Sequence, residues 1–450
     1  MPDNRLLIAA VLLLAPLLAV DVPPLLDYPN HLARCVLLAF AGRDAVLGAM
    51  AEIHWAIIPN LAIDLIVTPL LWVMPVHLAG RLFLAATLLL PVLGCIAYSR
   101  AINGATSWWP SMSALVAGAG TFLLGFVNFN FSLGLALLLA AGWIRTRNIF
   151  AVTVFTGVLF FAHLMGVVFF LILVGAHELD RLLRTRRLSL ASLPLLLMPA
   201  VLYINAPLST TGGGVNFLSP ADKLALLPLP FLTYNWAFDI ATAAIVIGFV
   251  VLRTRMAREA KIAMALLAIF YLATPHSFKA TEGLDTRFLT MFALMLFAAP
   301  VPGIGMARLP FTLLLGARAL VMMAVWSGFA EDLAGLRAAI VAVPAGAKIY
   351  AAAAPLEHPS TARRLSDGTR LDLHLPALLL IEHHAFWPTL FDEPAQQPIR
   401  WRPTYRALAD QTGGIMDLPL PLHATCGYDG ILIIGGAAPF ARLQARRQPC

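Results

Sequence analysis

Charged residues are scarce in this chain. Among its 450 residues only 12% are Asp, Glu, Lys or Arg, and 60% are hydrophobic. Soluble domains are about one quarter charged, so the deficit excludes a mainly soluble protein and predicts that most of the chain lies in a bilayer. The net charge of +7 does not indicate a nucleic-acid partner, because the basic residues form short clusters between apolar runs, as in the loops of polytopic membrane proteins.

The chain also has little cysteine. Its four cysteines show none of the spacings of a metal site. Cys426 and Cys450 are candidates for a disulfide if their domain lies in an oxidising compartment, and the sequence does not decide whether they pair.

Apolar runs dominate what is present, and the basic clusters between them set an expected topology. A spanning helix needs about 20 apolar residues, and Lys and Arg mark cytoplasmic ends. Holding every basic cluster inside predicts about eleven spans, at 5–22, 79–99, 107–124, 127–144, two short helices within 148–178, 188–206, 236–252, 262–276, 286–300 and 309–328. The first is interpreted as an uncleaved helix rather than a signal peptide, because no A-x-A-like site follows it.

Two segments are expected outside the bilayer core. Residues 57–76 contain one acid and three prolines, which suit a span poorly, so we interpret them as a re-entrant or interfacial part of an external loop at 23–78. Residues 330–450 read as strand, helix and strand ("AKIYAA", "LPALLLIEHHAF", "YDGILIIGG") and predict a small extracytoplasmic α/β domain. The expected fold is an α-helical polytopic membrane module, residues 1–329, followed by that domain.

The unusual polar residues gather at the outer face of this topology. They are Asp27, His31, Arg34, Asn128, Asn130, His163, Asp285 and Arg287. Ionisable groups at membrane depth are costly and tend to mark function, whereas an ion conductor needs polar groups distributed across the membrane. Clustering at one face favours an external active site over transport.

The stretch "DYPNHLAR" is the most informative of these. Asp27 to His31 and His31 to Arg34 are i,i+4 and i,i+3 pairs, which can share one helix face, and Pro29 suits the first turn of such a helix. Asp27 is then a candidate base towards an acceptor hydroxyl, and His31 and Arg34 are candidates for binding phosphate or orienting that carboxylate. A helix cap with a surface ion pair is the alternative.

The remaining candidates also have simpler alternatives. His163 is either a substrate contact at a helix turn or a packed core residue. Arg287 is a candidate phosphate contact and Asp285 a substrate-binding candidate, unless they form a local pair where a helix enters the membrane. "TGGG" at 211–214 lacks the Lys-Ser/Thr of a phosphate loop. "EHH" at 382–384 is a poor metal site, because adjacent residues point to different sides of a helix.

Several stretches together resemble a known family. "DYPNHLAR", "LGFVNFNFSLGLAL", "FFAHLMG", "LDTRFL" and "FWPTLFDEPAQQP" are similar to stretches of bacterial multi-pass proteins of the GT-C glycosyltransferase-like class, which includes protein O-mannosyltransferases, oligosaccharyltransferases and aminoarabinose transferases. The resemblance covers most of the chain in layout. Its key chemical feature is an acidic residue just outside the first helix, and Asp27 holds that place.

The resemblance implies an inverting transfer of a sugar from a polyprenyl-phosphate-linked donor to a glycan, lipid or protein acceptor, in the inner membrane of a bacterium. It implies that Asp27 activates the acceptor or binds a metal, and that Arg287 contacts the donor phosphate. The first loop has no second acid beside Asp27, so a divalent metal stays an open expectation. A non-catalytic membrane scaffold and a lipid-linked glycan transporter are the rival interpretations.

Overall fold

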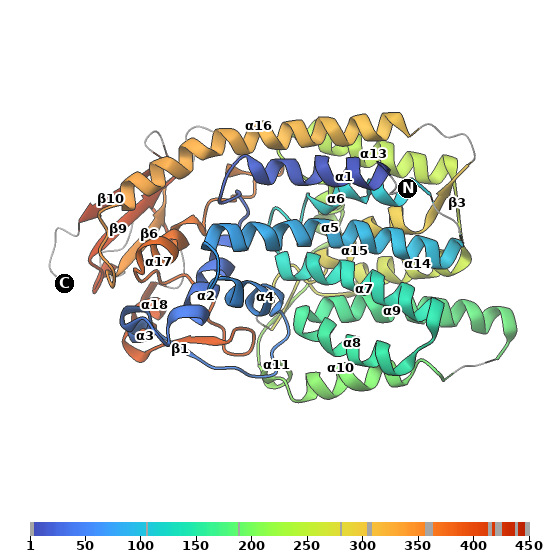
Figure 1. The fold of residues 1–450 in the computed structure, drawn as a ribbon, viewed down its shortest axis with the longest axis horizontal. Helices are drawn as coiled ribbons and strands as arrows, with labels where there is room; N and C mark the ends of the chain where they lie inside the picture. The colour runs from blue at the N-terminus through green and yellow to red at the C-terminus, as the bar shows by residue number, and fades with distance from the viewer. Residues whose placement is uncertain are drawn as a thin grey trace.

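The computed structural model describes residues 4–104, 107–187, 190–279, 281–303, 308–355, 363–412, 416–418, 425–436 and 440–445. It is mostly helical, with a few small sheets (Figure 1). Among the described residues, four helices are long and apolar enough to cross a membrane. They are α5 (Val76–Asn103), α7 (Val127–Thr146), α13 (Trp236–Arg253) and α16 (Leu309–Ile340).

Shorter helices lie beside these four and complete a helical bundle (Figure 1). Among them α8 and α9 meet at His163, as the sequence predicts for 148–178. The shorter helices are α1 (Asn4–Leu14) with the 3₁₀ turn η1 (Ala15–Leu18), α8 (Ile149–Ala162), α9 (Leu164–Thr185), α10 (Pro194–Ile204), α14 (Arg258–Ala273) and α15 (Thr286–Ala298).

The prediction of a continuous helix at 107–124 is wrong. The chain there forms a 3₁₀ turn, η2 (Trp109–Ser113), one turn of α-helix, α6 (Ala114–Ala117), and then a series of turns up to α7. Gly120 and Gly125 have φ values of +48° and +80°, which are left-handed conformations that break a right-handed helix. The apolar composition of this stretch suits burial in the bundle as well as it suits a spanning helix.

The two central helices approach each other closely. A Cβ atom on Gly134 of α7 would lie 2.3 Å from the backbone carbon of Leu90 on α5. Small residues allow helix backbones to pack at short distance where the surroundings are apolar. This contact fixes α7, and therefore the loop that precedes it, against α5.

A second body, which we call the lobe, caps one end of the bundle (Figure 1). Its sheet has the strand order β10-β9-β6-β8, with β6 parallel to β9 and β8 and with β10 antiparallel to β9. The lobe elements are β6 (Ile349–Ala353), η5 (Leu375–Ala377), α17 (Leu378–His383), β7 (Ile399–Trp401), α18 (Pro403–Thr412), β8 (Met416–Asp417), β9 (Gly430–Ile434) and β10 (Ala441–Ala445).

The lobe is built from two distant parts of the chain. Strand β1 (Ala51–Ile53) pairs antiparallel with β7, and α2 (Tyr28–Phe40) packs on η5 and α17. Helices α3 (Ala45–Met50) and α4 (Ala62–Leu70) belong to the same N-terminal segment. The segment expected as an external loop at 23–78 is thus joined to the later domain, and α16 continues to Ile340, past the expected boundary at 330.

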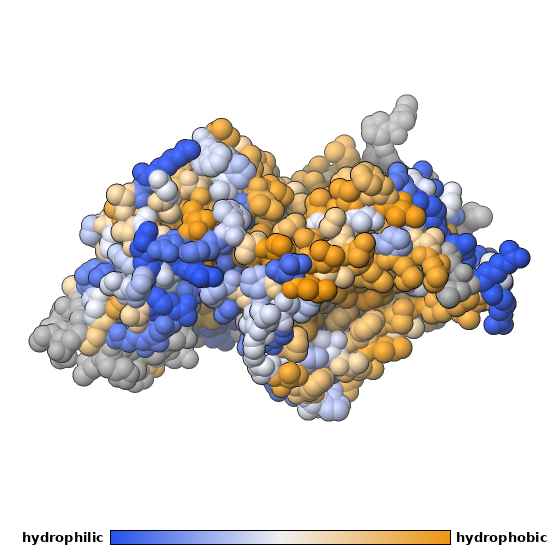
Figure 2. All heavy atoms as spheres, turned by 90° about the horizontal axis from the view of Figure 1, so that it is seen from below, coloured by the Kyte–Doolittle hydropathy of each residue, from blue (hydrophilic) through white to orange (hydrophobic). Residues whose placement is uncertain are grey.

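The remaining short elements connect the bundle helices. They are α11 (Pro207–Thr210), β2 (Val215–Asn216), α12 (Pro220–Ala225), η3 (Leu229–Phe231), β3 (Thr254–Met256), β4 (Ser277–Phe278) and β5 (Pro300–Pro302). Strand β2 pairs with β4, and β3 pairs with β5. Hydrophilic residues gather over the lobe and the far end of the bundle, and apolar residues cover the helices between them (Figure 2), as expected of a membrane protein.

Candidate functional site

A cavity of about 950 Å³ lies between the lobe and the bundle. Its size falls in the range of small-molecule sites, about 300–1,000 Å³. Its wall is formed by side chains from both bodies. They are Leu26, Asp27, His31, Asn60, Phe126, Asn128, Phe129, His163, Gly214, Val215, Asn216, Ser277, Lys279, Thr281, Glu282, Arg287, His374, Leu390, Phe391, Asp392, Glu393, Gln396, Gln397 and Arg406.

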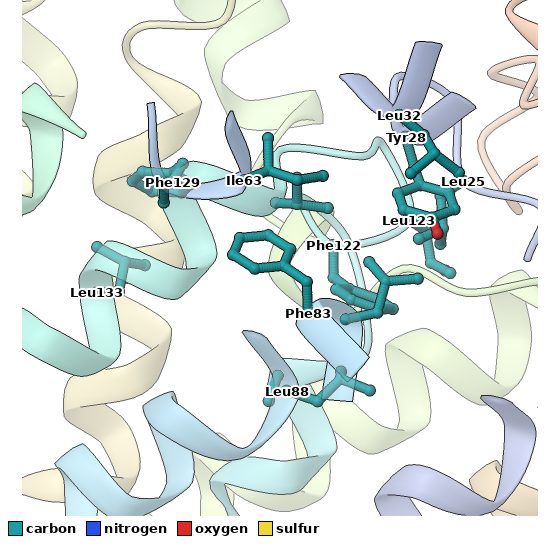
Figure 3. Packing of buried hydrophobic residues seen from close by; sticks show 14 of the residues in the cluster. Leu25, Tyr28, Leu32, Ile63, Phe83, Leu88, Phe122, Leu123, Phe129 and Leu133 are labelled. Carbon is teal, nitrogen blue, oxygen red and sulfur yellow. The ribbon is translucent and has the colours of Figure 1, made fainter. Parts of the chain in front are cut away.

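Asp27 is held in the cavity wall by its backbone. Its N–H donates to the carbonyl of Leu124 at 3.2 Å, and a Cβ atom on Gly125 would lie 2.4 Å from that same nitrogen. Leu25 and Tyr28, which flank this position, are buried and lie near Leu123 (Figure 3), and the N–H of Leu26 donates to the carbonyl of Leu123 at 3.0 Å. The carboxylate therefore sits at a fixed point where the loop before α7 meets the start of α2.

His374 of the lobe lies beside this carboxylate. Its Nδ1 atom is 3.0 Å from Oδ1 of Asp27, which is within ion-pair distance, but the angles do not meet those of a hydrogen bond. The imidazole is held edge-on by Phe391 and Trp387, with ring centroids 5.1 Å and 6.1 Å away. Two parts of the chain that are remote in sequence thus form one acid–imidazole pair.

His31 enters the cavity one helical turn after Asp27, as the spacing predicts. Its ring is buried and contacts Phe391 edge-on at 5.8 Å. Burial, followed by the positive charge of Arg34, lowers the pKa of His31 well below its usual value. His31 is therefore neutral at pH 7 and offers a polar ring nitrogen rather than a charge.

Two other residues of "DYPNHLAR" connect α2 to neighbouring segments and do not bind in the cavity. Asn30 donates to the carbonyl of Thr389 and accepts from the N–H of Phe391, both at 2.9 Å, so it joins α2 to the lobe. Arg34 does not line the cavity. It forms a two-point ion pair with Asp64 of α4, at 2.6 and 2.8 Å, and both side chains are fully buried.

His163 lies in the wall at the junction of α8 and α9. Its Nδ1 atom accepts a hydrogen bond from the N–H of Met165 at 3.0 Å, so a neutral ring carries its proton on Nε2. The ring packs edge-on against Phe129, with centroids 5.6 Å apart. His163 is both a buried helix cap and a hydrogen-bond donor available to a ligand.

Arg287 is a cation without a protein partner among the residues that the structure describes. Its guanidinium stacks over the rings of Phe126 and Phe129, at 5.5 and 5.9 Å from their centroids. Its Nε–H group is buried and donates a hydrogen bond to no described acceptor. Its charge is close enough to Asp27 for the two to interact electrostatically. A desolvated guanidinium with free donors is suited to a phosphate.

Asp285 lies outside the cavity wall, although it precedes Arg287 by only two residues. It accepts from Lys223 at 2.9 Å, lies 2.8 Å from Nδ1 of His276, and caps α15 through the N–H of Thr286. These contacts use both carboxylate oxygens. Asp285 therefore holds Lys223, His276 and the start of α15 together and does not face the cavity.

Several wall residues could not be predicted from the sequence. His374 is the most important, and nothing near it in the chain distinguishes it from other histidines. Asn216 lies in β2, directly after the "TGGG" stretch, and Lys279 directly follows β4, the strand that pairs with β2. Asn128 lies in the wall and also binds Asn60 and the N–H of Ile63, so it ties down the segment before α4.

The described residues contain no group of three or more His, Cys, Asp or Glu side chains that could hold a metal ion. At 382–384, Glu382 binds Arg337 and His77, whereas His384 lies 2.8 Å from Asp44. The pairing of Cys426 with Cys450 lies outside the described residues, because Cys450 is not among them. The wall thus does not fit a metal bound by protein ligands alone.

A scan of protein-family models, a search of curated proteins and a search of solved structures each found no match to this chain. The site is therefore characterised by its chemistry alone. It combines the Asp27 carboxylate, the unpaired guanidinium of Arg287 and the buried imidazoles of His31 and His163 in one cavity. Three further acids and two further cations line the same wall, namely Glu282, Asp392, Glu393, Lys279 and Arg406. Such a set can bind an anion and accept a proton from a neighbouring hydroxyl.

Proposed function

We propose that this protein is an inverting glycosyltransferase that uses a polyprenyl-phosphate-linked sugar. The observation that supports this most is that the Asp27 carboxylate and the partnerless Arg287 guanidinium share one cavity of about 950 Å³. A scaffold without activity has no need of a desolvated cation opposite a carboxylate. Such a pair suits a reaction that needs both a base and a phosphate contact.

The donor phosphate binds Arg287, with His163 donating from Nε2. The lipid tail of the donor lies between the bundle helices, and the sugar projects into the cavity. Phe126 and Phe129 keep the guanidinium in place through ring contacts. Because phosphate is a good leaving group, positioning and charge stabilisation supply much of the rate enhancement.

Asp27 is the base for the acceptor. The acceptor oxygen forms a bond to the anomeric carbon, the bond from that carbon to the phosphate oxygen breaks, and the hydroxyl proton passes to Asp27. Polyprenyl phosphate leaves with the bonding electrons. We assign no step to a metal ion, because the described wall does not offer a protein ligand set for one.

The proposal includes a membrane layout. The chain crosses the inner membrane of a bacterium about eleven times, with the irregular stretch 107–124 in place of one of the helices, and the lobe and cavity face the extracytoplasmic side. The acceptor is a glycan, lipid or protein that reaches the lobe from that side. The four long apolar helices and the separation of hydrophilic from apolar surface support a membrane location (Figure 2).

Transfer from a panel of radiolabelled polyprenyl-phosphate sugars by purified protein tests the proposal. The parent is expected to transfer sugar, and Asp27→Asn to lose about 10²–10⁴-fold in rate while still binding undecaprenyl phosphate. Arg287→Gln is expected to lose that binding. Glu331→Gln, a change at an exposed acid on α16, is the matched control.

Two results would count against the enzyme. Equal transfer by the parent and Asp27→Asn would move the base away from the first loop. Absence of both transfer and undecaprenyl-phosphate binding would favour the scaffold interpretation, provided that the circular dichroism of the protein shows it to be folded.

A further inference from the structure

A second cavity, of about 490 Å³, lies on another side of the bundle. It is lined by η1 and the residues after it, by the start of α5 and by the lobe end of α16, which run beside one another (Figure 1). No residue lines both this cavity and the one that contains Asp27. It is therefore a separate site, and its role does not depend on the proposed transferase activity.

One wall of the second cavity is apolar. Ala330, Leu333 and Ala334 lie on the same face of α16, since they are three and four residues apart. Leu18 of η1 completes this wall and is 83% exposed. Helix α16 is long and apolar enough to span a membrane, and this wall lies towards its lobe end. Its two alanines are small and leave width for a hydrocarbon chain.

The other wall carries two arginines in different situations. Arg337 is neutralised, since it donates to Asp21 at 2.7 Å and to Glu382 at 2.7 Å. Burial alone would raise the pKa of Glu382, but its bonds with His77 and Arg337 lower that pKa to about 2. Both carboxylates therefore stay charged and engaged with Arg337.

Arg81 of α5 has no such partner among the residues that the structure describes. Its Nε atom is buried and no oxygen accepts from it, and no described carboxylate lies within ion-pair distance of its guanidinium. A desolvated donor without an acceptor is costly. An anion in the cavity would supply the missing acceptors.

We propose that this cavity binds the phosphate group of an anionic phospholipid through Arg81, with an acyl chain against Leu18 and the alanines of α16. A guanidinium binds phosphate through two parallel hydrogen bonds. The combination of an apolar wall on a candidate membrane-spanning helix with a cation beside it matches a lipid better than a soluble anion. A free phosphate compound shares the headgroup chemistry, and the experiment separates the two.

The test measures lipid binding to the purified full-length protein by native mass spectrometry, with phosphatidylglycerol, phosphatidylcholine and diacylglycerol as probes. Phosphatidylglycerol is expected to bind best. Arg81→Gln is expected to weaken its binding at least about tenfold, the loss typical of one charge-assisted contact. Ala330→Phe, which fills the apolar wall but keeps the charge, is expected to weaken it as well.

Arg43→Gln is the matched control. It removes an exposed cation that stacks on Trp72 and is expected to leave phosphatidylglycerol binding unchanged. Unchanged affinity in both Arg81→Gln and Ala330→Phe would overturn the proposal. Displacement of the lipid by micromolar glycerol phosphate would also overturn it, and would assign the site to a soluble phosphate.

Discussion

The Nδ1 atom of His374 lies 3.0 Å from the Oδ1 atom of Asp27. One residue belongs to the lobe and the other precedes α2, so the pair exists only when the lobe is seated on the bundle. Asn30, which binds the backbone at Thr389 and Phe391, fixes that seating within a few residues of Asp27. Formation of the site and docking of the lobe are therefore one structural event.

Replacement of His374 tests the role of this pair. His374→Ala is expected to lower kcat of sugar transfer by about 10²-fold, the cost of a misplaced catalytic group, with a change in KM below about threefold. His374→Asn keeps a donor near the carboxylate and is expected to recover part of the rate. His383→Ala is the control. An unchanged kcat in His374→Ala would show that Asp27 is oriented by its backbone alone.

The buried pair of Arg34 and Asp64 predicts a large effect on stability. Arg34→Met leaves Asp64 charged and buried, so the free energy of unfolding is expected to fall by about 3–5 kcal/mol. The double variant with Asp64→Leu is expected to recover most of this loss. Thermal unfolding in detergent measures both. Glu52→Gln, which breaks an exposed pair with Arg402, is expected to cost less than about 1 kcal/mol.

Gly125 links backbone conformation to the position of Asp27. Gly125→Ala is expected to be destabilising and to lower transfer, because the residue has a φ of +80° and its Cβ would lie 2.4 Å from the Asp27 nitrogen. The matched control is Gly142→Ala in α7, where no atom lies within 4 Å of the new Cβ; this change is expected to stabilise by about 0.5–1 kcal/mol. Equal effects of the two variants on transfer would contradict the prediction.

The burial of His31 predicts a pH dependence. Its pKa is lower in the folded protein than its ordinary value of 6.5, so below pH 6.5 the unfolded state binds the proton first. Stability is therefore expected to be intact above pH 6.5 and to fall as the pH decreases towards the lowered pKa, by up to about 1.4 kcal/mol per pH unit for this residue.

Denaturant unfolding of the parent and of His31→Phe at pH 5, 6, 7 and 8 measures this slope. The variant is expected to lose the contribution of one proton. Glu382 has a folded pKa of about 2 and affects stability over a different pH range. Its contribution to the free energy of unfolding is lost only as the pH falls below about 4.5. Identical slopes for the parent and His31→Phe would contradict the assignment to His31.

The sequence predicted local features well where one local signal dominates. The junction of α8 and α9 at His163 follows from an apolar run interrupted by one polar residue between basic clusters. The start of α2 follows from Pro29 near its first turn and from helical spacing of the polar residues. The prediction of a helix at 107–124 was wrong, because composition does not distinguish a buried irregular segment from a spanning helix. The turns in this stretch depend on positive φ values at glycines.

The sequence by itself determined that this is a mostly apolar, helical chain with an acidic, polar stretch after its first apolar segment. Tertiary structure alone decided which of the predicted residues line one cavity, namely Asp27, His31, His163 and Arg287. It also decided that Arg34 and Asp285 lie outside the cavity wall, in ion pairs with Asp64 and Lys223. In addition, it decided that His374 meets Asp27. The physical reason is that helical periodicity is local and can be read along the chain, whereas the partner of a buried charge depends on the packing of distant segments, which no short-range pattern encodes.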